Sequence, residues 1–325
     1  MTLAAVGVVG VLGCETPQPS QGNALFRGAS AMVRKLSNAP PSSTPGTFFT
    51  EGFEDPCFEC RGWYDNTQAP VTTAEKAVGN GAAEFRFVPG ATKPVRGDAM
   101  RRRFPASQSV YVSYRVKYSV GWVGSRKPHH PHEFMVLSTM DDAYAGPSYA
   151  RLALYVEQNY DGGGHPRLAI QDSKSINTGF GALPVNLTGL ADDRSVASCN
   201  GPVESGLVGE CYNAPPWSNN KQLRGPAVFS PNPGPGYISD WNRVEAYFRL
   251  NSIKDGTAIA DGVMQYWFNG NLILDRHDIV FRTPAREDLR LNQFIIAPYI
   301  GDGSPIAQSM FVDDLIVAPQ RPETR

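Results

Sequence analysis

Net charge, cysteine and long apolar runs are all scarce in this sequence of 325 residues. Lys and Arg number 30 against 31 Asp and Glu, which leaves a net charge of -1. A chain so balanced has no broad basic field of the kind that recruits nucleic acid. No nucleic-acid partner is therefore expected, and any binding of an acidic partner must come from a local cluster of cations.

Several catalytic signatures are also missing. The sequence has no Gly-x-Ser-x-Gly motif, so an α/β-hydrolase is unsupported. No segment carries the Glu-x-Asp-x-x-Glu carboxylates of retaining jelly-roll glucanases, which disfavours hydrolysis through paired carboxylates. The glycine-rich turn Asp161–His165 lacks the Lys-Ser/Thr of a phosphate-binding loop.

The N-terminal residues form a short apolar run that ends in Val11-Leu12-Gly13-Cys14. This run has the length of a signal-peptide core, not of a membrane span, and its end resembles a bacterial lipobox. Cleavage before Cys14 and acylation of its sulfur would make a lipid anchor the only membrane contact. No basic residue precedes the run, and the alternative is a buried N-terminal strand. We expect export, either to the outer membrane or cell surface or into the medium.

The chain is expected to divide into four segments. Residues 1–14 are assigned to the signal peptide, and residues 15–47, rich in Pro, Ser and Gly, to a flexible tether. Residues 48–318 are assigned to the folded domain and residues 319–325 to a tail.

Four cysteines remain once Cys14 is set aside: Cys57, Cys60, Cys199 and Cys211. An even count in an exported chain predicts disulfides, and local pairing of Cys57 with Cys60 and of Cys199 with Cys211 is the simplest scheme. A zinc site built from the same four residues is the rival interpretation.

Residue-by-residue alternation of apolar and polar side chains predicts antiparallel sheet in the last third of the chain. The alternation is clearest over Trp241–Asn251, which is followed by Asp261–Gly270 and by Phe311–Val317. The dipeptide Asn269-Gly270 predicts a hairpin turn. Together with 32 Gly and 27 Pro, this pattern favours strands and loops over helices. The predicted strands are 48–54, 82–88, 110–120, 133–139, 150–158, 167–172, 243–251, 263–268, 292–300 and 311–317. Residues 173–240 are predicted to form a long functional loop.

A family resemblance rests on this C-terminal region, which fits the pattern W-x-x-V/I, LN, DG, W-x-NG, DDL. From Phe48 to Ala318 the chain resembles the concanavalin-like β-jelly-roll polysaccharide lyases of the alginate- and glucuronan-lyase type. The resemblance implies an all-β fold, a two-sheet antiparallel jelly roll, in which the first and last strands pair. It also implies a monomeric enzyme that needs no cofactor and cleaves an acidic, uronic-acid-containing polysaccharide by β-elimination.

The resemblance also suggests catalytic residues. Ser125-Arg-Lys127-Pro and Ser148-Tyr-Ala-Arg151 approximate two family motifs, so Lys127 and Arg151 would neutralise the substrate carboxylate. His132 or Tyr155 would take the proton, and Gln171 would hydrogen-bond the carboxylate. The family's Tyr-x-Tyr is absent from the matching segment, His165–Gln171. A non-catalytic glycan-binding protein is therefore the alternative function.

Polar residues that alternate along neighbouring strands suggest a ligand face lined by cations and tyrosines. An ordinary solvated outer face would show the same alternation. The predicted substrate-binding residues are Arg115, Lys117, His130, Arg167, Arg243 and Tyr247.

The segment Lys127–Glu133 contains three of the five histidines: His129, His130 and His132. It is interpreted as a solvated loop, as a base at the sheet edge, or as a metal site completed by His165 or Glu133, which would make the protein a His-ligated metalloenzyme acting on polysaccharide. Separately, Asp313-Asp314 could hold a structural calcium ion or could cap a turn.

Overall fold

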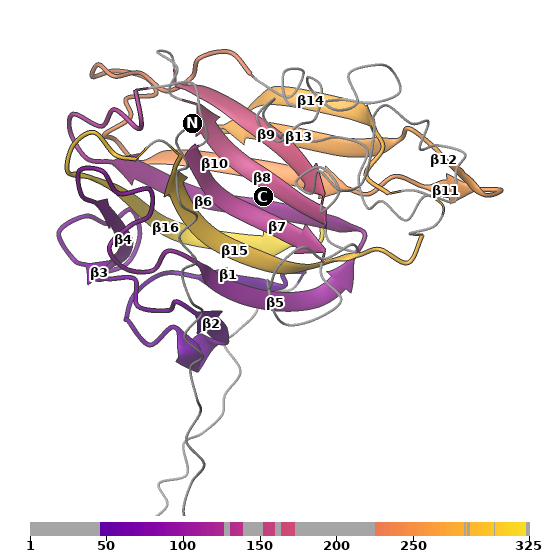
Figure 1. Ribbon diagram of the computed structural model, residues 1–325, viewed down its shortest axis with the longest axis horizontal. Coiled ribbons are helices and arrows are strands. Elements are labelled where there is room, and N and C mark those ends of the chain that lie inside the picture. Colours follow the sequence, from indigo (N-terminus) through magenta and orange to yellow (C-terminus); the bar gives the residue numbers. More distant parts are fainter. Residues whose placement is uncertain are drawn as a thin grey trace, which may run out of the picture. The chain divides into compact units, whose positions relative to one another are not determined.

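The computed structural model describes residues 46–126, 131–138, 152–159, 164–172, 225–282, 284, 287–301 and 303–322. The chain separates into two compact units, 1–39 and 40–325, and all described residues belong to the second. Antiparallel strands dominate this second unit, as the sequence predicts (Figure 1). The described residues include one short 3-10 helix, η1 (Glu59–Arg61), and Pro284 is also in 3-10 conformation. No helix of the described part is long and apolar enough to cross a membrane.

Two large sheets make up the fold. Sheet A has the spatial order β14 (Asn271–Ile279), β13 (Gly262–Phe268), β10 (Asn242–Arg249), β6 (Ser109–Tyr118), β16 (Gln308–Ala318), β4 (Ala82–Phe87) and β3 (Val71–Thr72), and β1 (Phe49–Glu51) also pairs with β16. Sheet B has the order β2 (Trp63–Asp65), β5 (Met100–Ser107), β15 (Leu291–Ile300), β7 (Pro131–Ser138), β8 (Leu152–Asn159) and β9 (His165–Asp172). A small separate hairpin joins β11 (Ile253–Lys254) to β12 (Thr257–Ala258).

The inner faces of the two sheets share one apolar core. Tyr114 of β6 packs against Phe134 of β7 with ring centroids 4.1 Å apart, and Phe49 of β1 lies 6.1 Å from Phe294 of β15. Figure 1 shows sheet B in front of sheet A, so the chain forms a two-layer sandwich. Alternation along each strand leaves each sheet with a second, outer face.

Every strand predicted from the sequence overlaps an observed strand. The predicted pairing of the first and last strands is confirmed, since Phe49 is in register with Val317. The Asn269-Gly270 turn between β13 and β14 is confirmed as well, because both residues have positive φ, +48° and +84°, as a type I′ turn requires.

Some strands were missed because side-chain alternation does not reveal them. In β5 the inward-facing Arg102 interrupts the apolar series, and its guanidinium lies 4.2 Å from the ring centroid of Phe49. β14 is an edge strand whose residues are largely exposed or charged, so it has no clear apolar face. The short strands β2 and β3 were also missed, as were β11 and β12.

The Cys57–Cys60 disulfide confirms the first predicted local pair. Cys14, Cys199 and Cys211 lie outside the described residues. The lipobox, the tether, the second disulfide and the 173–240 loop therefore stay predictions, apart from the loop's last residues, which are described from Gly225 onward.

Candidate functional site

Four of the predicted substrate-binding residues, Arg115, Lys117, Arg243 and Tyr247, lie on the outer face of sheet A. Arg115 Nε lies 3.5 Å from an Asp314 carboxylate oxygen, and Lys117 Nζ lies 2.7 Å from a Glu75 carboxylate oxygen. Tyr247 is half-buried on β10. The two cations are thus paired with carboxylates of the chain itself.

Arg243, the fourth of these residues, belongs to a network centred on Glu245. The Glu245 side chain is 1% exposed, accepts hydrogen bonds from Tyr111 (2.6 Å) and Arg321 (3.0 Å), and lies 3.6 Å from Arg243. Burial would raise the pKa of Glu245, but these hydrogen bonds and the charges of both arginines outweigh it and keep that pKa below its usual value. Arg321 also covers the ring of Trp267 at 4.6 Å. The predicted tail therefore includes a residue that packs on sheet A.

Asp313 is fully buried on the same sheet, at the end of a regular stretch of β16. Its carboxylate accepts hydrogen bonds from the backbone N–H groups of Ala77 (2.8 Å), Val78 (2.9 Å) and Asp314 (2.7 Å). Burial raises the pKa of Asp313 in spite of these bonds. This arrangement matches the capping alternative, because the carboxylate ties a loop to the last strand. Among the described residues, no three or more His, Cys, Asp or Glu side chains are grouped to hold a metal ion.

The outer face of sheet B has a different composition. Strand register aligns residues of β5, β15, β7, β8 and β9 in rows across the sheet. One row is Arg101, Ile295, Met135, Tyr155 and Ala169; the next is Arg103, Gln293, Leu137, Ala153 and Gln171; a third is Tyr299, His132, Glu157 and Arg167. Register thus brings the predicted His132, Tyr155, Arg167 and Gln171 onto neighbouring rows of a single sheet.

Gln293 occupies the middle of this face and is completely buried. Its Nε2 donates a hydrogen bond to the Tyr64 hydroxyl, while its Oε1 has no hydrogen-bond partner among the residues that the structure describes. Arg103, the residue aligned with it on β5, is exposed. A buried amide oxygen without a partner is uncommon in folded proteins, so it requires an explanation.

Tyr64 connects this amide to the arginines of β5. Burial raises the pKa of the Tyr64 phenol, whereas the positive charges of Arg101 and Arg103 and a hydrogen bond with Arg103 lower it, and burial prevails. Arg101 is itself paired with Asp65 at 2.7 Å. The phenol is therefore kept protonated within a local positive field.

Tyr155 is only 4% exposed and belongs to a small apolar cluster separate from the core. The other members are Ala153 on the same strand and Ile295 and Ala297 on β15. Glu157, two residues further along β8, is 1% exposed. The outer face of sheet B therefore combines an apolar floor with cations, phenols and an amide, a combination typical of carbohydrate sites.

The prediction that these polar residues share one ligand face is wrong, because they are divided between the two sheets. Arg115, Lys117, Arg243 and Tyr247 lie in sheet A, whereas Tyr155 and its neighbouring rows lie in sheet B. The error has a physical cause: β6 pairs with β10 and β16, but the next strand in the sequence, β7, pairs with β15 in the opposite layer. Strands adjacent in sequence therefore carry their polar residues to opposite sides of the sandwich.

Lys127, His130 and Arg151 lie outside the described residues, as does His129. His165 begins β9, and its Nδ1 lies 2.8 Å from the carbonyl oxygen of Gly225, to which it can donate. His132 is on β7, two strands away from β9. The described histidines of the proposed metal site, His132 and His165, therefore lie on strands that are not neighbours in the sheet.

The sequence reasoning missed Tyr64, Arg101, Arg103 and Gln293. The signal was present for the arginines, because Met100-Arg-Arg-Arg-Phe104 places a cation at each of the outward positions 101 and 103. Gln293 could have been found as the polar residue that alternates with Phe294 in a predicted strand.

Comparisons with known proteins place the fold. No protein-family model matches the chain, and no match was found among curated protein sequences. The marine alginate lyase from Aplysia kurodai superposes with a TM-score of 0.52 at 11% identity, covering 84% of this chain and 99% of that one. An alginate lyase from Chlorella virus gives 0.48 at 15% identity, with 78% and 89% covered. The endo-β-1,4-glucuronan lyase from Trichoderma reesei gives 0.43 at 10% identity, with 78% and 87% covered. The chain has the jelly-roll fold of polysaccharide lyases. At these identities the likeness concerns the fold alone.

Proposed function

We propose that this protein is a polysaccharide lyase that cleaves a uronic-acid-containing polysaccharide by β-elimination on the outer face of sheet B. The observation that carries the proposal is the group formed by Arg103, Gln293 and Tyr64. It offers a cation for a carboxylate and a protonated phenol, and the buried amide of Gln293 donates a hydrogen bond to that phenol. The jelly-roll fold supports the same class.

The chemistry assigns roles to these groups. A base removes the C5 proton of the uronate, an enolate forms, the C4–O bond breaks, and a proton is delivered to the leaving oxygen. Cations at the carboxylate acidify C5–H and stabilise the enolate. We assign this task to Lys127, Arg151 and Arg103. Proton removal is assigned to His132 or Tyr155, and Gln171 would hydrogen-bond the carboxylate.

The test is the appearance of unsaturated uronate ends, followed by absorbance, on incubation with alginate, glucuronan and heparin-type glycans. Arg103→Ala should lower kcat/KM at least about a hundredfold, by analogy with loss of one donor to a developing oxyanion. Arg115→Ala is the matched control. Arg115 lies on sheet A, opposite the proposed site, and is paired there with Asp314, so this variant should leave kcat/KM unchanged. Absence of product on all three polymers would refute the proposal.

One observation favours a second candidate, a non-catalytic glycan-binding protein. Ala169 is the β9 residue aligned with Tyr155, and β9 contains no tyrosine. That function predicts saturable binding of a polyuronate with no unsaturated product after prolonged incubation. Product formation that is lost in Arg103→Ala would exclude it.

A further inference from the structure

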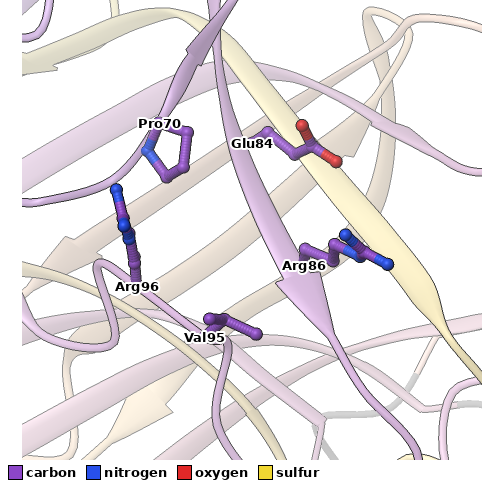
Figure 2. Close-up of a pocket in the computed structure, with 5 residues that line it drawn as sticks. All are labelled: Pro70, Glu84, Arg86, Val95 and Arg96. Atoms are coloured by element: carbon purple, nitrogen blue, oxygen red, sulfur yellow. The ribbon is translucent and has the colours of Figure 1, made fainter.

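A hollow of about 240 Å³ lies on the outer face of sheet A, away from the residues assigned to catalysis. Pro70, Glu84, Arg86, Val95 and Arg96 line it (Figure 2). Glu84 and Arg86 project from β4, on the face opposite the core residue Phe85.

The hollow is formed by backbone that continues the sheet beside β4. Glu84 N–H donates to the carbonyl oxygen of Pro70 at 2.9 Å, and Val95 N–H donates to that of Arg86 at 2.8 Å. Both bonds lie on the same edge of β4, because backbone groups of alternate residues point to the same side of a strand. Pro70 and Val95 are therefore fixed at the two ends of the hollow.

The loop that presents Arg96 is also firmly anchored. Thr92 accepts a hydrogen bond from Ile300 N–H at 2.8 Å. At the other end, Gly97 has φ +73°, and a Cβ added there would lie 2.6 Å from the Cβ of Ala69. Only glycine allows this close approach, so the backbone on both sides of Arg96 is held in place.

The two arginines of the hollow differ from the other cations of this face. Arg115, Lys117, Arg243 and Arg321 all have carboxylate partners. Within the part of the chain that the structure describes, the exposed side chains of Arg86 and Arg96 make no hydrogen bond or ion pair. Glu84 is engaged by the Ser309 hydroxyl at 2.8 Å.

We infer that this hollow is a second, non-catalytic binding site for a carboxylate-bearing sugar of the polymer chain. Guanidinium forks match carboxylates, Pro70 and Val95 offer apolar surface to a sugar ring, and the free oxygen of Glu84 can accept from a hydroxyl. The choice of an acidic polysaccharide as ligand rests on the proposed function. A site on the sheet opposite the catalytic face would hold one stretch of a long polymer, or a neighbouring polymer chain, while another stretch is cleaved. Binding there would raise the local concentration of polymer at the catalytic face.

The test measures the rate at which phenylglyoxal modifies each arginine, resolved by peptide mapping. The reaction is run with polyuronate, with a sulfated glycan, with neutral dextran, or with acetate at the same carboxylate concentration. At polyuronate concentrations about ten times the dissociation constant, modification of Arg86 and Arg96 should slow about tenfold, by mass action. Dextran and acetate should give no protection. Unchanged modification with polyuronate, or protection by the sulfated glycan alone, would overturn the inference.

Substitutions separate this site from the catalytic one. Arg86→Ala/Arg96→Ala should raise KM for long polymer about tenfold while leaving kcat on short oligosaccharides unchanged. The control Lys76→Ala/Lys254→Ala removes the same charge from exposed positions outside the hollow and should change neither. Equal effects of the two double variants would refute a specific site. If the wild type forms no product, the lyase proposal fails, but protection of Arg86 and Arg96 still decides this one.

Discussion

Replacement of Gln293 by leucine should leave the protein as stable as the wild type, or more stable, while impairing turnover. Removal of the buried, unpartnered Oε1 recovers about 1–3 kcal/mol, and loss of the bond from Nε2 to Tyr64 costs about 0.5–1.5 kcal/mol. The balance lies between a loss of about 0.5 kcal/mol and a gain of about 2.5 kcal/mol, which changes Tm by at most a few degrees for a domain of this size. We expect kcat/KM to fall at least about tenfold, because the Tyr64 hydroxyl loses the amide that donates to it.

Gln308 provides the matched control, since it is also a buried glutamine on a strand. Its Oε1 accepts from Val123 N–H at 2.9 Å, and its Nε2 donates to the carbonyl oxygen of Gly124 at 2.8 Å and to the Ser304 hydroxyl at 2.6 Å. Gln308→Leu leaves two backbone groups without partners, a buried carbonyl and a half-buried N–H, so it should destabilise the fold by about 3 kcal/mol or more.

Thermal melts and turnover of both variants give the answer together. A fall in Tm for Gln293→Leu as large as that for Gln308→Leu would refute the reasoning that Gln293 is held at a cost to stability. Full turnover in Gln293→Leu would show that the Gln293 amide has no role in the reaction. Retained stability with reduced turnover is the combination expected of a functional group, because such sites trade stability for binding.

Two further predictions concern individual arginines. Arg321→Ala should lower stability by about 1 kcal/mol at neutral pH, because Glu245 loses a hydrogen-bonded cation. Since the folded-state pKa of Glu245 is depressed, this difference in Tm should be complete above the unfolded pKa of about 4.3 and should shrink as the pH falls further; a difference that grows on acidification would contradict the assignment. Arg151→Ala should abolish turnover with a change in stability within about 0.5 kcal/mol, and Arg151→Lys should restore little, because an ammonium does not reproduce the planar fork. Unchanged turnover in Arg151→Ala would exclude this residue from the site.

The sequence predicted the strands better than it predicted the site, and the reason lies in what alternation can report. Alternation identified correctly that Arg115 and Lys117 face away from Val112 and Val116. It could not report which sheet each strand joins, because pairing depends on long-range register. The amide of Gln293 is another example: its position in a strand was predicted, but its unpartnered oxygen depends on side chains from β2, β5 and β15 meeting in space.

Charge pairing offers a physical criterion for deciding which cations of such a sandwich can bind an anionic ligand. On sheet A, Arg115, Lys117 and Arg243 are paired with Asp314, Glu75 and Glu245, and these carboxylates neutralise their charge. An anionic ligand would have to displace a carboxylate of the chain to reach them. On sheet B, Arg103 lies beside a phenol and an amide, those of Tyr64 and Gln293. Arg86 and Arg96 differ from these three cations, because their exposed side chains make no hydrogen bond or ion pair with the residues that the structure describes. Cations that the fold does not neutralise are where an acidic polymer can bind with the least competition from the protein's own carboxylates.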